Sequence, residues 1–471
     1  MQVFKKFSLF FCLMCLTACS SSKVISDKGG VTDFNTDISE INISEKSSFR
    51  VGVLLPLTGA ASKHGAGLKN ASMLAVEDIN NPNIVLQYYD TQSTPSGARI
   101  AAENAIRQGA KVIIGPLMST EVQAIANETI YQGVPVVAFS TSQEVLQPTV
   151  YTLGLLIEEQ VDRIVSYAVA QNRNRLALLL PDNSTGNAVA KAAVKSAKKN
   201  NISITVIGYY PPASSDFSTI IKQMTNYEQR HAEVLRIKAE LESKVQNGDT
   251  NAAAELKQIE TKEGIGDVGF DMILIPESGA KLTSAISMFA YYDAGFPDVL
   301  FLGTSVWETG KFNNESVMHQ SLFPTISRSY SGYFAGKYYQ IFGEKPSSLY
   351  SFAYDAIALS NELSKKQDED LNPVITNPDG YVGINGAFRF FEDGTNQHSL
   401  DVIEIRSSGN IVADAASKRF EDNGETIKLP SISATDIDVA PKIFGKDEKS
   451  AQIAIYGEII PDKNSENENL E

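Results

Sequence analysis

The stretch RVGVLLP, residues 50–56, decides the fold class, because it has the pattern of a short buried strand closed by a proline. Thr58 and Gly59 follow it as a turn. Segments with apolar residues at every third and fourth position then alternate with further short apolar stretches. Such an alternation is typical of a mainly parallel sheet covered by helices on both faces. The sequence therefore predicts an α/β fold.

The alternation falls into two consecutive blocks. In the first block we expect strands at 50–55, 84–89, 111–115 and 134–139, and helices at 67–80, 96–108 and 121–131. In the second block we expect strands at 175–180, 203–209, 270–275 and 299–302, and helices at 160–171, 187–200, 218 onward and 282–292. Helices at 330–342 and 351–364 and strands at 388–391 and 400–405 follow. Two blocks of similar size predict two similar lobes.

One charged segment, residues 227–259, interrupts the second block. Its composition favours helix, and Gly248-Asp249 lies past its middle, so we expect two antiparallel helices projecting from the second lobe. A solvated insertion and a hairpin that docks a partner are both compatible with this pattern.

The N-terminus has the pattern of a bacterial lipoprotein. Lys5 and Lys6 precede an apolar stretch, residues 7–16, and small residues lead to Cys19, so residues 1–18 read as a signal peptide. The apolar stretch is shorter than the ~20 residues that span a bilayer. We expect cleavage before Cys19 and lipid on its thiol. Since no Asp follows the cysteine, the pattern favours the outer membrane over the inner membrane of a Gram-negative cell.

Polar segments flank the expected globular body. Residues 19–48 are rich in Ser, Asp, Asn and Thr and are expected to be a flexible tether. Residues 418–471 are acidic and polar, and we expect most of this tail to be disordered, although 453–460 could dock or pair as a strand.

Composition excludes several classes of function. All 3 cysteines lie within the first 19 residues, so the mature body has neither thiol nor disulfide, and the 4 histidines have no ligand spacing. The net charge of -15 disfavours nucleic acid as a partner. The sequence has no nucleophile elbow, phosphate loop or paired carboxylates at a diagnostic spacing. We therefore expect a protein that is not an enzyme, with no catalytic residue, metal or cofactor.

Hydroxyl side chains follow two neighbouring strands. Ser119 and Thr120 lie between an expected strand and a helix, and Thr141 and Ser142 follow the next strand. Ligands of open α/β sheets bind outside the carboxyl ends of the strands. Hydroxyl and N–H groups at a helix N-terminus favour an anion such as a carboxylate. We predict that these four residues bind a ligand, and we also expect Ser119 and Thr120 to be helix N-caps.

The order of elements from about 50 to 412 resembles the type I periplasmic-binding fold and, within it, the leucine/isoleucine/valine-binding family. The segments that carry this resemblance are Val51–Gly59, Ile114–Thr120 and Val137–Ser142. The resemblance implies two α/β lobes, each a mainly parallel sheet with helices on both faces. It places lobe one at 49–157 plus 324–387, and lobe two at 158–323 plus 388–417 with a helical insertion at 227–262.

The resemblance also implies ligand residues in lobe two. The amino-acid binders of this family have an aromatic residue and an acid at two positions where this chain has Thr185 and Ser305. A buried ammonium group needs a carboxylate or several oxygen acceptors. Glu277 and Asp182 lie at strand ends and could substitute for the acid, or could simply be solvated.

Further segments resemble the envelope lipoproteins described as penicillin-binding protein activators. These segments are Gly303–Glu308, Ala353–Leu359 and Gly380–Phe390. This resemblance implies a lipid-anchored periplasmic regulator of peptidoglycan synthesis that docks on a peptidoglycan synthase. The alternative is the solute-binding component of an ABC importer, with an ABC permease as partner and a branched-chain or related amino acid, or another small carboxylate, as ligand. Trp307 would either pack in the core or contact a ligand or partner.

Overall fold

The computed structural model describes residues 48–327, 331–420 and 427–428, which belong to the same compact unit. The expected signal peptide, Cys19 and nearly all of the tether lie outside these residues, as does segment 453–460. Within the described ranges, no helix combines the length and the apolar character needed to cross a membrane.

The sheet of lobe one is fully parallel, with strand order β2-β1-β3-β4-β5. Its strands are β1 (Phe49–Leu55), β2 (Ile84–Asp90), β3 (Val112–Ile114), β4 (Val136–Ala138) and β5 (Val150–Thr152). Its helices are α1 (Ser62–Ile79), α2 (Pro95–Arg107), α3 (Ser119–Gln132) and α11 (Ser348–Ser364). Val53 packs in the core that contains α1 and α11, whereas Leu54 packs with α2 and α3. Successive residues of β1 are therefore buried on opposite faces, which explains the continuous apolar run.

The sheet of lobe two is mixed, with strand order β15-β14-β10-β9-β8-β6-β7. Its strands are β6 (Arg175–Pro181), β7 (Ser203–Tyr210), β8 (Met272–Leu274), β9 (Leu300–Leu302), β10 (Leu322–Ile326), β14 (Leu400–Glu404) and β15 (Ile411–Asp414). Its helices are α4 (Ile157–Ala170) and α5 (Ser184–Asn200) on one face, and α6 (Ser218–Met224) and α9 (Gly279–Tyr291) on the other. Strands β6 to β10 are parallel, and β14 and β15 close the sheet in antiparallel register.

A third, small sheet has the order β13-β12-β11-β16. Its strands are β11 (Tyr381–Gly383), β12 (Gly386–Phe390), β13 (Asn396–His398) and β16 (Ile427–Lys428). Its aromatic side chains, among them Phe388 and Phe390, pack into the core of lobe one. Short helices complete the described chain: α10 (Ser331–Phe342), α12 (Asn372–Ile375), η1 (Gln143–Val145), η2 (Ser305–Thr309) and η3 (Ser316–Met318).

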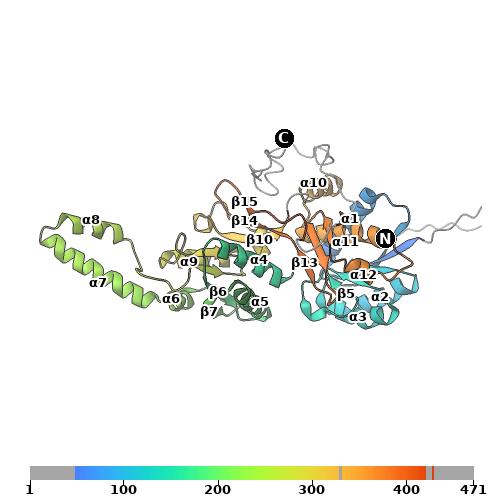
Figure 1. The fold of residues 1–471 in the computed structure, drawn as a ribbon, viewed down its shortest axis with the longest axis horizontal. Coiled ribbons are helices and arrows are strands. Elements are labelled where there is room, and N and C mark those ends of the chain that lie inside the picture. Colours follow the sequence, from blue (N-terminus) through green and yellow to red (C-terminus); the bar gives the residue numbers. More distant parts are fainter. Residues whose placement is uncertain (1–47, 328–330, 421–426, 429–471) are drawn as a thin grey trace, which may run out of the picture. The chain divides into compact units, whose positions relative to one another are not determined.

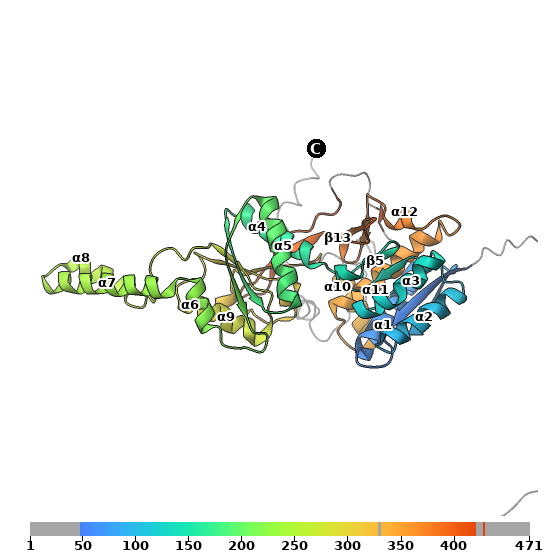
Figure 2. The same ribbon diagram turned by 90° about the horizontal axis from the view of Figure 1, so that it is seen from below.

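The charged segment forms the two helices that its composition predicts, α7 (Tyr227–Gln246) and α8 (Thr250–Ile259), which lie side by side (Figures 1 and 2). Asp249 begins α8, since its carboxylate accepts the N–H groups of Asn251 and Ala252. The base of the pair is fixed to lobe two by Arg230, which is 6% exposed. Its guanidinium donates to the carbonyls of Tyr292 (2.9 Å) and Asp293 (2.8 Å).

The structure moves two segments across the expected lobe boundary. The resemblance places residues 324–326 in lobe one, but they belong to β10, which pairs with β14 in the sheet of lobe two. It places residues 388–398 in lobe two, yet Phe390 packs against Tyr151 of lobe one, with ring centroids 5.7 Å apart. Both differences have one cause. The lobe to which a short strand belongs depends on the strands and side chains it packs with, and the local sequence does not show which ones these are.

The start of the expected tail is also ordered. Phe420 is buried, with the guanidinium of Arg389 stacked 4.4 Å from its ring centroid. Residues 427–428 form β16 beside β11. The expectation concerns most of the tail, and apart from residues 418–420 and 427–428 the tail lies outside the described residues.

Candidate functional site

The expected ligand residues of lobe one lie at the carboxyl ends of two adjacent strands. Ser119 and Thr120 open α3, directly after β3, and Thr141 and Ser142 follow β4. The backbone N–H groups of Ser119 and Thr120 have no hydrogen-bond partner among the described residues. Free N–H groups in the first turn of a 14-residue helix attract an anion. This edge of the sheet therefore has the donors that a carboxylate needs.

The expected N-cap of α3 is wrong by one residue. The N-cap is Met118, whose N–H donates to Glu121 Oε2 at 3.2 Å. Glu121 is fully buried, and Thr91 at the end of β2 donates to its other oxygen at 2.7 Å. Burial raises the pKa of Glu121, although the bonds from Thr91 and Met118 act in the opposite direction. Since Glu121 caps the helix, the hydroxyl of Ser119 is not needed for capping.

The loop after β4 is held by its own hydroxyl groups. Ser140 Oγ accepts the N–H of Ser142 at 3.1 Å, and Ser142 Oγ accepts the N–H of Glu144 at 3.3 Å. Ser142 is thus the cap of η1. Thr141 between them is exposed, so its hydroxyl is available to a ligand.

A further carboxylate, Asp90, organises the neighbouring loop, and sequence reasoning missed it. Its oxygens accept the N–H groups of Leu57 (2.9 Å) and Gln92 (2.8 Å) and the hydroxyl of Thr58 (2.7 Å). Burial acts to raise the pKa of Asp90, but these hydrogen bonds outweigh it and the pKa is lowered. The sequence feature that could have indicated this role is an aspartate at the end of a strand beside a turn, because aspartate there often bonds to backbone N–H groups.

In lobe two the expected residues also follow adjacent strands. Thr185 lies after β6, Glu277 after β8 and Ser305 after β9, and these strands are neighbours in the sheet. Thr185 is exposed in the first turn of α5, where Asn183 is the N-cap. The sequence thus assigned these residues to one edge of the sheet correctly, and their contact with a ligand stays a prediction.

Glu277 is a positioned carboxylate. Its Oε2 accepts the hydroxyl of Tyr210 at 2.7 Å, and its Oε1 accepts the N–H of Ser278 at 3.0 Å. Tyr210 is 2% exposed, and burial together with the carboxylate of Glu277 raises the pKa of its phenol. A carboxylate has about four lone-pair sites, so Glu277 can accept further bonds from an ammonium group. Asp182, the other acid at this edge, is exposed.

Trp307 packs in the core of lobe two, which is one of the two roles expected for it. Its side chain is 0% exposed, and its Nε1 donates to the carbonyl of Ile275 at 3.2 Å. A Cβ on Gly303 would lie 2.1 Å from the indole, so glycine is required there. The backbone of Ser305 is held separately, since its N–H donates to Gln160 Oε1 at 2.9 Å. Trp307 therefore supports the loops that carry Glu277 and Ser305.

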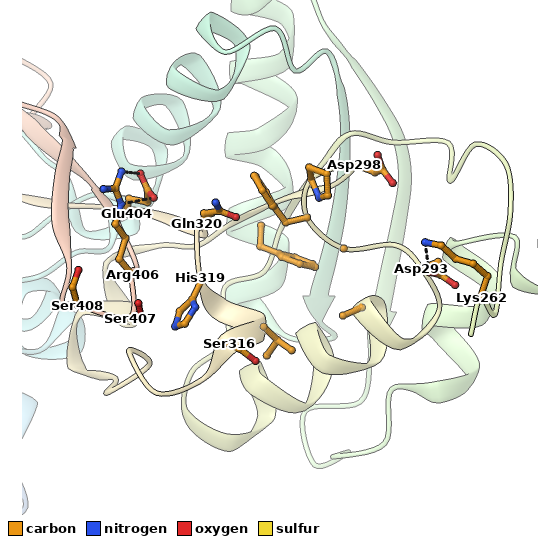
Figure 3. Close-up of a pocket in the computed structure, with 16 residues that line it drawn as sticks. Lys262, Asp293, Asp298, Ser316, His319, Gln320, Glu404, Arg406, Ser407 and Ser408 are labelled. Carbon is orange, nitrogen blue, oxygen red and sulfur yellow. Dashed lines mark hydrogen bonds and ion pairs between the residues drawn. The ribbon is translucent and has the colours of Figure 1, made fainter. Parts of the chain in front are cut away.

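A cavity of about 740 Å³ lies elsewhere in lobe two (Figure 3). It is lined by the segments that precede β9 and β10 and by the segment that follows β14, so it lies at the edge of the sheet opposite to Glu277. Its charged groups are largely paired: Lys262 with Asp293, and Arg406 with Glu404, each at 2.8 Å. None of the expected ligand residues lines this cavity.

In the described part of the chain, no group of three or more His, Cys, Asp or Glu side chains is arranged to hold a metal ion. The hydroxyl, N–H and carboxylate groups at the two strand edges are instead suited to a small polar organic ligand.

Two lobes with mainly parallel sheets, and with polar loops at the carboxyl ends of the parallel strands, define a two-lobe binding fold. Residues 48–410, most of the chain, match the family model of periplasmic binding proteins, and the chain belongs to that family.

Similar proteins agree with this family. The Leu/Ile/Val-binding protein of Escherichia coli K12 is 22% identical over 194 residues, 39% of this chain and 53% of that protein. A putative branched-chain amino acid ABC transporter structure from Rhodospirillum rubrum matches with a TM-score of 0.61 and 16% identity, over 76% of this chain and 98% of that one. The isoleucine complex of LivJ from Streptococcus pneumoniae matches with a TM-score of 0.50 and 16% identity, over 79% of this chain and 100% of that one. The chain spans about half the length of the curated relatives it matches.

Proposed function

We propose that this protein is a periplasmic solute-binding protein that takes up an amino acid or a related small carboxylate and is not an enzyme. The observation that carries the proposal is the free N–H pair of Ser119 and Thr120 at the start of α3, with the hydroxyl of Thr141 on the adjacent loop. The names of the similar proteins, which are binding proteins for Leu, Ile and Val, support the same conclusion. An ABC permease would be the partner.

The ligand's charge pattern follows from the two strand edges. Its carboxylate would bind at the α3 N-terminus in lobe one. Its ammonium would bind Glu277 in lobe two. Glu277 would take the role of the family's acid, whose position holds Ser305 in this chain. Closure of the two lobes would bring both ends of the ligand into contact with protein.

Calorimetric titration of residues 20–471 tests this proposal. We expect micromolar binding of leucine, and a loss of at least about tenfold in affinity for Ser119→Ala combined with Thr141→Ala, because hydrogen bonds to a charged group contribute about 1.5–3 kcal/mol. Glu277→Gln should weaken leucine but leave 4-methylpentanoate, which lacks the amino group, unchanged. Ser203→Ala is the matched control, since Ser203 is exposed at the opposite end of β7. Equal affinity in the double variant and the wild type would refute the site.

A second candidate function is regulation of peptidoglycan synthesis through protein contacts, as the activator resemblance implies. The α7–α8 pair favours it, because this pair is an addition to the parallel α/β lobe and Leu235 on it is 55% exposed. The lipid anchor at Cys19 and an outer-membrane location belong to both candidate functions and remain predictions.

Shortening the α7–α8 pair separates the two functions. We expect replacement of residues 239–257 by a short glycine turn to change the thermal midpoint by less than about 2 °C, because the anchoring bonds of Arg230 remain. Binding to a purified bifunctional peptidoglycan synthase should then fall while leucine binding persists. Arg230→Ala is the control that disturbs the base and keeps the tip. Undiminished synthase binding by the shortened protein would exclude residues 239–257 from docking. Leu235→Ser then tests the exposed side chain that the shortened protein keeps, and undiminished binding there too would exclude the pair.

A further inference from the structure

Two of the chain's crossings between the lobes run side by side and are tied together. Residues 153–156 lead from β5 to α4, and residues 398–400 lead from β13 to β14. Asn396 Nδ2 donates to the carbonyls of Thr152 (2.6 Å) and Gly154 (2.9 Å). His398 Nε2 lies 3.0 Å from the carbonyl of Leu153. Since a carbonyl only accepts, Nε2 carries the proton and Nδ1 is the bare acceptor.

Side chains of α4 in lobe two reach this pair of crossings: Arg163 Nε donates to the carbonyl of Leu400 at 2.8 Å, and Glu159 reaches His398. Glu159 lies in the first turn of α4, and both of its oxygens accept the backbone N–H of His398 at 3.1 Å. His398 ends β13, whose sheet packs in the core of lobe one. The carboxylate of Glu159 therefore fastens a helix of lobe two to a strand of lobe one, at the place where the chain passes between them.

The surroundings of Glu159 oppose its negative charge. Burial raises its pKa well above the ordinary value, the N–H of His398 lowers it, and the like charges of Glu158 and Asp162 on the same helix raise it again. Arg389 from β12 is the opposing positive charge. Burial lowers the pKa of His398 to about 4, so its ring is neutral at neutral pH.

Several polar atoms around these crossings are buried without a partner. They are His398 Nδ1, Asn396 Oδ1 and Glu158 Oε2. Each orphaned buried group costs roughly 1–3 kcal/mol, and native structures contain few of them. These groups lie beside Glu159, and a shift of the crossings would change which partners they reach.

We propose that Glu159 is a latch residue, whose carboxylate holds the two crossings in the present lobe arrangement and whose release allows the lobes to change their mutual angle. The latch acts through the backbone of His398 and needs no contact with a ligand. It follows from the two-lobe fold alone and does not depend on the identity of the ligand.

Hydrogen exchange of the full chain, resolved for peptides covering 396–400, tests the latch. We expect Glu159→Gln to speed exchange of the His398 amide about tenfold, because a charge-assisted bond becomes a neutral one. Glu159→Ala should speed it further. Glu158→Gln is the comparison on the same turn and should change exchange less than Glu159→Gln, because only Glu159 bonds the N–H of His398. Peptides from β6 report on the fold of lobe two and should keep their protection in all three variants.

The distance between the lobes is a second measurement. It should not change if Glu159 only stabilised the fold without controlling the lobe arrangement. Spin labels on non-natural residues at the exposed positions 132 and 195 report one lobe against the other. We expect Glu159→Gln to shift or broaden the distance distribution. The wild type should show the same change as pH falls, and the change should start above pH 4.5 because the pKa of Glu159 is raised. Glu159→Gln should lack this pH response. Unchanged His398 exchange, or one pH-independent distance distribution shared by wild type and variant, would overturn the latch.

Discussion

Replacing Trp307 by alanine is expected to lower the free energy of unfolding by about 3–5 kcal/mol, the range for removing a fully buried large aromatic side chain. The indole is 0% exposed and lies against Gly303 and Phe323, so its removal leaves a void that the surrounding chain fills only partly. The carbonyl of Ile275 also loses its indole donor, which adds roughly 1 kcal/mol. Urea unfolding followed by far-ultraviolet circular dichroism measures the change, since the variant has no tryptophan to report fluorescence.

The same substitution should weaken ligand binding without any ligand contact at Trp307. Ile275 precedes Glu277 by two residues, and Trp307 follows Ser305 by two, so the indole bond joins both loops. Trp307→Phe is the control, because it keeps an aromatic ring and loses only the Nε1 donor and part of the volume. We expect it to cost less stability than the alanine variant. A Trp307→Ala protein as stable as the wild type would contradict the packing role.

The sequence was most informative where burial alone determines the structure. The run that forms β1 is buried on both faces, and its position at the start of the alternation predicted a parallel sheet correctly. The sequence also locates the ends of strands, because a short apolar run is followed by polar residues. It therefore predicted the strand-end positions of the hydroxyl residues after β3 and β4 and of Thr185, Glu277 and Ser305.

The sequence was uninformative where a long-range partner determines the structure. Strand β10 has five residues, and its pairing with β14, far along the chain, identifies it. Glu121 was missed as the cap of α3 because a capping box is recognised by Ser or Thr at its start, and this one begins at Met118. The bond between Tyr210 and Glu277 joins residues 67 positions apart, so no local pattern could show that Glu277 is held.

A buried carboxyl in lobe one, Asp355, should make the stability of the protein fall as pH rises. Asp355 is 1% exposed on α11, and its oxygens accept the N–H groups of Ile384 (2.8 Å) and Asn385 (3.2 Å). Burial raises its pKa to about 7, although these two bonds act to lower it. Gly383 must be glycine for this contact, because a Cβ there would lie 2.1 Å from the carboxylate.

The sign of the effect follows from proton binding. With a pKa of about 7 in the folded protein against 3.8 in the unfolded chain, the folded state binds more protons between these values. The free energy of unfolding therefore decreases as pH rises from about 4 to 7, and the decrease is complete above pH 7. At 1.36 kcal/mol for each pKa unit, Asp355 alone removes on the order of 4 kcal/mol. Urea unfolding at a series of pH values between 4 and 8 measures this slope.

Asp355→Asn should abolish the slope that belongs to this residue, because the amide does not titrate. The comparison is the difference between wild type and variant at each pH, since Glu121 and Glu159 also have raised pKa values and contribute to both proteins. Asp90→Asn is a control of opposite sign. The pKa of Asp90 is lowered, so its contribution is present above its unfolded pKa and is lost as pH falls. If the difference between wild type and Asp355→Asn does not vary with pH, then Asp355 is ionised throughout this range, and the bonds from Ile384 and Asn385 outweigh its burial.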